Sequence, residues 1–342
     1  MRTGVSYFGN RMPEHYRGRD LPEIAAAGCT YVLHTFSEND LAFYRETMGD
    51  IVAATHEVGL DVVFDPWGVG GVFAGEAESR LLLDHPDAWQ QGSDGALVPA
   101  ACPLSPDLRT LIERWVDATA AVGADSVLWD EPGFGAPGPD GSRWTCRCAR
   151  CQNEYRQSFG ESMPLRQTPN VLAFREKLII GLVEWCCRVA HERGLRNTVC
   201  LPAQEDHRAS VQDWDAIARL QDVDALAVTP FWALWGKDVD PYVSQYAGRL
   251  VATCRANGRE PQVWLQSFLI PTGREEEIAR AADAAVAAGV EDIAAWGYRG
   301  CGHMSSLRCA DPEAAWSAIG RMFRRFRGID SGDPTEPRPA AR

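Results

Sequence analysis

Short apolar runs alternate with longer amphipathic segments along most of the chain. The short runs are rich in β-branched or apolar residues, and the long segments repeat their apolar positions at helical spacing. The short runs predict eight strands, at residues 5–8, 31–35, 61–65, 126–130, 198–202, 225–229, 262–267 and 292–297. The long segments predict helices at residues 40–58, 106–122, 169–193, 211–220, 241–256, 275–288 and 312–327.

Strands that alternate with helices form parallel sheets, which are either open and doubly wound or closed into a barrel. A doubly wound sheet that binds a nucleotide has a glycine-rich turn after its first strand, and none follows Phe8. We therefore expect a single (β/α)8 TIM barrel over residues 1–328, followed by a polar, Pro-rich tail at 329–342. Two long loops, 66–105 and 131–168, follow the third and fourth strands and lie on the face where barrel enzymes build active sites.

Composition and charge exclude several classes of partner. The 342 residues are 45% hydrophobic and 24% charged, as in ordinary globular proteins. The formal charge of −13 and the lack of a basic run argue against nucleic acid and anionic membranes as partners. No secretory leader or long apolar stretch is visible, which predicts a cytoplasmic protein. A homo-oligomer is compatible with this composition.

Four of the eleven cysteines are spaced like metal ligands. A C-x-C-x-x-C motif in the second long loop consists of Cys146, Cys148 and Cys151. Cys102 lies near the end of the first long loop. Four thiolates fill the tetrahedral coordination of Zn²⁺ and leave no position for a catalytic water. We therefore expect a structural zinc that joins the two long loops.

The chemistry of a barrel enzyme projects from the carboxyl ends of its strands. The acids there are candidate catalytic residues, namely Asp65, Asp130, Glu131 and Glu205. No lysine is found at a strand end, which argues against Schiff-base chemistry. Indole rings beside carboxyl groups suit a sugar, because flat aromatic faces cover its apolar side while the acids cleave the glycosidic bond. The candidate substrate-binding residues are Asn10, His34, Trp67, Trp232, Gln266, Trp296 and Arg299.

One segment carries a family resemblance. Residues 102–134 read CPLSPDLRTLIERWVDATAAVGADSVLWDEPGF and are followed by CRCARC at 146–151. This segment resembles the catalytic barrel of the β-galactosidases of glycoside hydrolase family 42. The resemblance implies zinc at the four cysteines and Glu131 as the general acid/base. The clan's nucleophile is a Glu at the end of strand 7, where this chain has Gln266.

An amide cannot form a glycosyl-enzyme ester, so another acid substitutes, the mechanism differs, or activity is lost. Asp65 and Glu205 come from strands that flank the fourth strand, and a pair with Glu131 would lie on one side of the pocket. That expectation disfavours a retaining mechanism. Three alternatives remain: a metal-dependent sugar isomerase or epimerase using Asp65, Glu131, Glu205 and His207, a non-catalytic glycan-binding barrel, and a phosphosugar site near Arg299.

Overall fold

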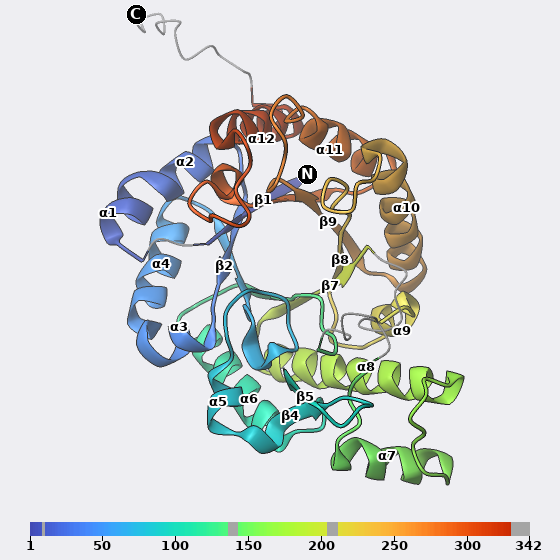
Figure 1. Ribbon diagram of the computed structural model, residues 1–342. Coiled ribbons are helices and arrows are strands. Elements are labelled where there is room, and N and C mark those ends of the chain that lie inside the picture. The colour runs from blue at the N-terminus through green and yellow to red at the C-terminus, as the bar shows by residue number, and fades with distance from the viewer. Residues whose placement is uncertain (9–10, 136–142, 204–210, 330–342) are drawn as a thin grey trace, which may run out of the picture.

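A closed barrel of eight parallel strands forms the centre of the molecule, as expected (Figure 1). The computed structural model describes residues 1–8, 11–135, 143–203 and 211–329. Around the barrel the strands follow the order β1-β10-β9-β8-β7-β6-β3-β2, and β1 pairs with both β10 and β2 to close it. The strands are β1 (Arg2–Tyr7), β2 (Tyr31–Thr35), β3 (Asp61–Asp65), β6 (Ser126–Trp129), β7 (Arg196–Pro202), β8 (Ala225–Thr229), β9 (Glu260–Gln266) and β10 (Asp292–Trp296).

Helices surround the strands, with their apolar faces turned to the barrel (Figure 1). The predicted helix at 40–58 is two helices, because Ser37 caps α3 through Asp40 and the backbone leaves the helical region at Tyr44 (φ −126°, ψ 20°). None of the described helices is long and apolar enough to cross a membrane. The helices are α1 (Pro13–His15), α2 (Leu21–Ala26), α3 (Glu38–Phe43), α4 (Arg45–Glu57), α5 (Arg80–Asp84), α6 (Pro106–Ala121), α7 (Ala149–Phe159), α8 (Pro169–His191), α9 (Trp214–Ala218), α10 (Val239–Asn257), α11 (Glu277–Ala287) and α12 (Pro312–Arg327).

Side chains that alternate along the strands fill the barrel. Gly4 is required there, because a Cβ atom at this position would lie 2.1 Å from the ring of Tyr31. The buried interior includes Leu33, Val63, Leu128, Cys200, Ala227, Trp264 and Ala294. The side chain two residues after each of these interior residues points the same way and lies at the barrel mouth. The residues at these mouth positions include Asp65, Asp130, Thr229, Gln266 and Trp296.

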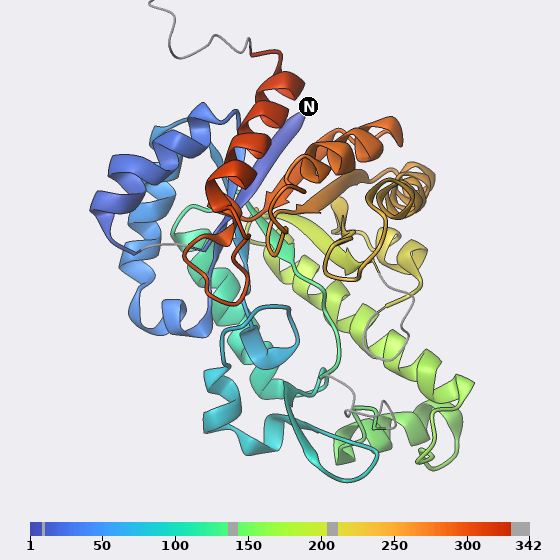
Figure 2. The ribbon, with the colours of Figure 1, turned by 45° about the horizontal axis from the view of Figure 1, so that its top comes forward.

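The segment between β3 and α6 contains secondary structure that the sequence analysis does not anticipate. An antiparallel hairpin of β4 (Trp89–Gln91) and β5 (Leu97–Ala101) follows α5. Figures 1 and 2 show this hairpin on the same side of the barrel as α7. The hairpin brings Cys102, the residue after β5, toward the amino end of α7.

Candidate active site

A pocket of about 220 Å³ opens at the carboxyl end of the barrel strands. Three acids line it: Glu76, Asp130 and Glu131. Trp67, Phe231, Trp235, Trp264, Phe268 and Trp296 provide aromatic walls. The pocket lies where parallel barrels place their active sites, and its combination of acids and flat apolar rings suits a polar ligand with an apolar face.

Glu131 is held in an unusual backbone conformation at the end of β6. Its φ of 40° lies in the left-handed region, which costs a non-glycine residue about 1–3 kcal/mol and is most common at functional sites. Its amide donates to the Cys200 carbonyl (3.1 Å), and Thr229 Oγ1 donates to Glu131 Oε1 (2.5 Å). Burial raises the pKa of Glu131, while the bond from Thr229 lowers it. The net rise favours a carboxyl group that can donate a proton.

Asp65 and Asp130 lie deeper in the barrel mouth. Asp130 is 5% exposed, whereas Asp65 is fully buried and neither of its carboxyl oxygens has a hydrogen-bond partner among the described residues. Burial raises the pKa of both groups well above the ordinary value, and repulsion from Asp130 adds to the shift at Asp65. The shift favours the neutral form of both acids. Asp65 does not line this pocket, and its catalytic role stays a prediction.

Two predicted tryptophans line the pocket and stack on each other. The rings of Trp67 and Trp296 are 5.8 Å apart and inclined by 26°. Phe8 packs edge-on against both rings, at 5.1 and 5.2 Å, and Trp264 packs edge-on against Trp296 at 5.3 Å. The contacts hold the indoles as rigid walls, which is the arrangement that the face of a sugar ring requires.

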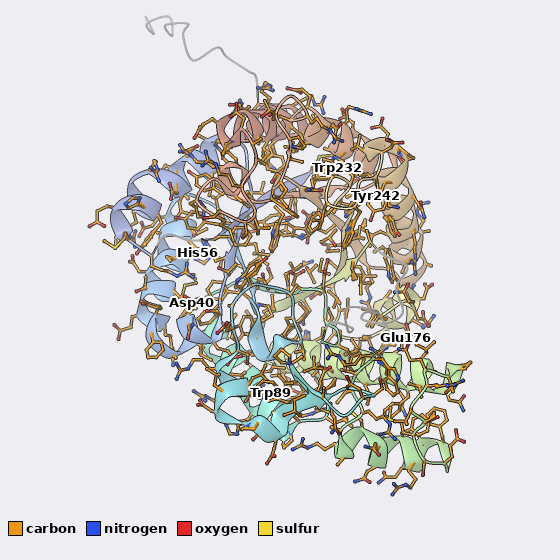
Figure 3. All side chains as sticks on the ribbon, in the orientation of Figure 1. Asp40, His56, Trp89, Glu176, Trp232 and Tyr242 are labelled. Carbon is orange, nitrogen blue, oxygen red and sulfur yellow. The ribbon has the colours of Figure 1, made fainter. Side chains whose placement is uncertain are left out.

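Three other residues predicted to bind substrate make contacts away from this pocket, and their binding roles stay predictions. His34 alternates with the inward Leu33, so it points to the helix layer, where its Nε2 lies 3.0 Å from Thr55 Oγ1. Burial lowers the pKa of His34 to about 3. The Trp232 indole (Figure 3) donates to Glu277 on α11 (2.9 Å). Arg299 forms ion pairs with Glu23 (2.8 Å) and Glu313 (3.4 Å). Asn10, Glu205 and His207 lie outside the described residues.

Gln266 is fully buried and binds backbone groups on both sides of it. Its Oε1 accepts from the amides of Ala233 (2.9 Å) and Leu234 (3.1 Å), and its Nε2 donates to the Phe268 carbonyl (2.9 Å). Leu234 and Phe268 line the pocket, but Gln266 does not. An ionised Glu could accept these bonds but could not donate to Phe268, which explains an amide at this position. Gln266 therefore holds the pocket wall, and its contact with substrate stays a prediction.

Glu76 is the acid that the strand-end argument missed. It follows β3 by eleven residues (65 to 76) and reaches the pocket through a loop, so no strand end marks it. Partial burial raises its pKa, and its charge raises the pKa of Asp65 and Asp130. The only sequence signal is its glycine-rich surroundings, GVGGVFAGEA, which indicate a tight turn without specifying where it leads.

Four buried cysteines could hold a metal ion beside the pocket loops. The sulfur atoms of Cys102, Cys146, Cys148 and Cys151 all lie within 4.8 Å of one another. Cys102 Sγ is 3.5 Å from the sulfurs of both Cys148 and Cys151. A tetrahedral zinc with bonds of about 2.3 Å separates its sulfurs by about 3.8 Å, so the spacing fits. Within the described parts of the chain, no other group of three or more His, Cys, Asp or Glu side chains is arranged to hold an ion.

Solved structures share this fold at low sequence identity. A β-galactosidase from the haloarchaeon Halorubrum lacusprofundi matches 97% of this chain with a TM-score of 0.75 and 16% identity. A β-galactosidase from Marinomonas ef1 matches 96% with a TM-score of 0.70 and 11% identity. The chain spans 59% and 61% of those two proteins.

An endo-1,4-β-mannanase from Rhizomucor miehei matches 96% of this chain and 95% of its own, with a TM-score of 0.64 and 9% identity. No known family profile matches the sequence. No curated protein matches it either. The expected similarity to the β-galactosidase barrel is therefore confirmed for the fold.

Proposed function

We propose that the chain is a glycoside hydrolase-like enzyme that binds a carbohydrate in this pocket, with Glu131 as the general acid. The observation that carries the proposal is the position of Glu131, a carboxyl group of raised pKa, in the same pocket as the stacked Trp67 and Trp296. The rings would bind the apolar face of a sugar, while Glu131 protonates the oxygen of the departing group.

Three features of the site support a proton donor at Glu131. Burial keeps a larger share of its carboxyl groups protonated near neutral pH. The Thr229 hydroxyl occupies Oε1, which leaves Oε2 to carry the proton toward the ligand. Burial and the neighbouring Glu131 raise the pKa of Asp130 well above its ordinary value, which disfavours a second negative charge beside the departing oxygen. Together these features match the raised-pKa acid of the two-carboxylate mechanism.

A panel of chromogenic glycosides tests the proposal. The purified protein should hydrolyse at least one of them, and Glu131→Gln should lower kcat by about 10²–10⁴, the usual contribution of a general acid. Glu184→Gln is the matched control, because Glu184 is exposed on α8. Equal turnover by Glu131→Gln and Glu184→Gln would refute the assignment of Glu131.

We also propose that the four cysteines hold a structural Zn²⁺. The support is the chemistry of the donor set, four buried thiols at tetrahedral spacing with no position left for water. Cys102 comes from the end of the hairpin, and Cys148 and Cys151 from the start of α7. Bound zinc would tie the segment after β3, which carries Glu76, to the segment after β6, which carries Glu131.

A further inference from the structure

We infer that Glu76 is the second catalytic carboxylate of this site, the base that takes a proton from the water attacking the sugar. The inference deepens the proposed function and rests on it, because it needs Glu131 to act as the acid. The related β-galactosidases place their second acid at the end of strand 7, but Gln266 occupies that place here and binds backbone groups instead. The described part of the pocket must therefore draw its base from another element.

The loop that carries Glu76 is bonded to the backbone that carries Glu131. The Ala74 amide donates to the Asp130 carbonyl (3.0 Å), and the Gly133 amide donates to the Val72 carbonyl (2.9 Å). Residues 72–74 therefore run beside residues 130–133, on either side of Glu131. Glu76 follows two residues after the first of these bonds, so its position relative to Glu131 is fixed by direct backbone contact.

Close packing at Gly75 orients the next residue. The φ of Gly75 is 131°, and a Cβ atom there would lie 2.6 Å from the Trp67 ring and 2.7 Å from the Gly68 amide nitrogen. The Gly68 amide also donates to the Ala74 carbonyl (3.0 Å), which closes the turn. Only glycine lets the chain pass this close to the indole that lines the pocket. The turn thus delivers Glu76 next to Trp67.

A buried carboxylate anchors both ends of the loop. Glu38, only 5% exposed, accepts from the Gly70 amide (2.8 Å), the Ser79 hydroxyl (2.6 Å) and the Leu81 amide (2.7 Å). These three bonds join residues 70 and 79–81, between which Glu76 lies. Three hydrogen bonds to one buried side chain hold the loop in one arrangement. Glu38 is a positioning residue.

The protonation of the neighbouring acids leaves Glu76 as the base. Burial raises the pKa of both Asp65 and Asp130 well above the ordinary value, and Glu131 must be protonated to act as the acid. Glu76 is the most exposed of the four acids and so loses the least hydration when it ionises, although partial burial still raises its pKa. The described pocket lining contains no Lys, Arg or His, so no cation competes for the carboxylate.

The reaction that follows is a single displacement. Glu131 gives its proton to the glycosidic oxygen, and the bond from that oxygen to the anomeric carbon breaks with its electron pair going to the oxygen. Water forms the new bond to the anomeric carbon from the other face of the ring and loses a proton to Glu76. Glu131 ends ionised and Glu76 ends protonated, and exchange with solvent restores both. The anomeric configuration is inverted.

Glu76→Gln tests this assignment, with Glu78→Gln as control because Glu78 is an exposed acid of the same loop. On the best substrate of the panel, Glu76→Gln should lower kcat by about 10²–10⁴, and Glu78→Gln should match the wild type. Proton NMR of the first product should show inversion by the wild type. Azide added to Glu76→Ala should form a glycosyl azide, because azide attacks without a base.

The outcomes separate the two proposals. If Glu131→Gln abolishes turnover while Glu76→Gln does not, Glu131 stands and the role of Glu76 is refuted. A wild-type product of retained configuration refutes the base role even if Glu76→Gln is inactive, because Glu76 would then be a nucleophile. If no glycoside of the panel is hydrolysed, the proposed function fails and this inference fails with it. Circular dichroism of each variant distinguishes a lost base from a lost fold.

Discussion

Thr229 donates a hydrogen bond of 2.5 Å to Glu131 and joins the end of β8 to the proposed acid at the end of β6. The two strands are separated in the barrel by β7, so the bond crosses the mouth above Cys200 and Pro202. This bond favours the ionised form of Glu131 and opposes the effect of burial on its pKa. Burial and the Thr229 hydrogen bond therefore act on the pKa of Glu131 in opposite directions.

Thr229→Val should raise the pKa of Glu131, because it removes the hydrogen bond that lowers this pKa. A general acid acts while protonated, so the alkaline limb of the kcat/KM profile should move to higher pH. Thr229→Ser keeps the hydroxyl and should leave the limb where the wild type has it. An alkaline limb that is the same in Thr229→Val and the wild type would show that Glu131 is not the group titrating there.

Gln266→Glu should destabilise the fold rather than restore a retaining nucleophile. An ionised side chain could not donate to the Phe268 carbonyl and would leave a buried charge, at a cost of about 1–3 kcal/mol or more. Burial raises the pKa of the new carboxyl group, so the loss of stability should grow as pH rises through that pKa. Thermal melts at pH 5 and pH 8 measure this, with the exposed Gln245→Glu as control. Faster turnover with retained configuration in Gln266→Glu would contradict the account.

Zinc binding should depend on each of the four clustered cysteines. Cys148→Ser should lose close to one zinc per chain and lower the melting temperature, because the metal links two segments and its binding is coupled to their folding. Cys254→Ser removes a buried thiol outside the cluster and should retain the metal. Elemental analysis of both purified variants measures the zinc content. A full zinc content in Cys148→Ser would exclude zinc binding by the four clustered cysteines.

The sequence was sufficient to predict the barrel, because alternation of short strands and amphipathic helices is a local pattern. Each of the eight predicted strands overlaps an observed one, although β1 begins at Arg2 rather than at residue 5. Glu131 and the cysteine motif were predictable for the same reason, since their positions follow from a strand end and a short spacing. The hairpin β4–β5 was not, because its strands are short and flanked by polar residues.

Glu76, His34 and Trp232 show what local pattern leaves undetermined. Glu76 reaches the pocket because other residues of its loop bond to Glu38 and to the Asp130 carbonyl, which are distant from Glu76 in the chain. The direction of His34 depends on which face of β2 points inward, and all five residues of that strand are buried, so no alternation is visible. Trp232 is positioned by Glu277 on a distant helix. The positions of all three side chains therefore depend on contacts between residues distant in the sequence.

Asp65→Asn should stabilise the protein more at pH 8 than at pH 5. Burial raises the pKa of Asp65 well above its ordinary value in the folded state, whereas the unfolded chain ionises it near its ordinary value of about 3.9. A group with a raised folded pKa contributes stability below its unfolded pKa and loses it as pH rises toward the folded pKa, so the wild type should be weakened above about pH 4. Asparagine keeps the shape and cannot ionise. Melting temperatures of both proteins across pH 4–8 test the sign, and parallel curves would show that Asp65 is ionised when folded. Activity measured on the same samples tests its role, and we expect Asp65→Asn to retain turnover because Asp65 does not line the pocket.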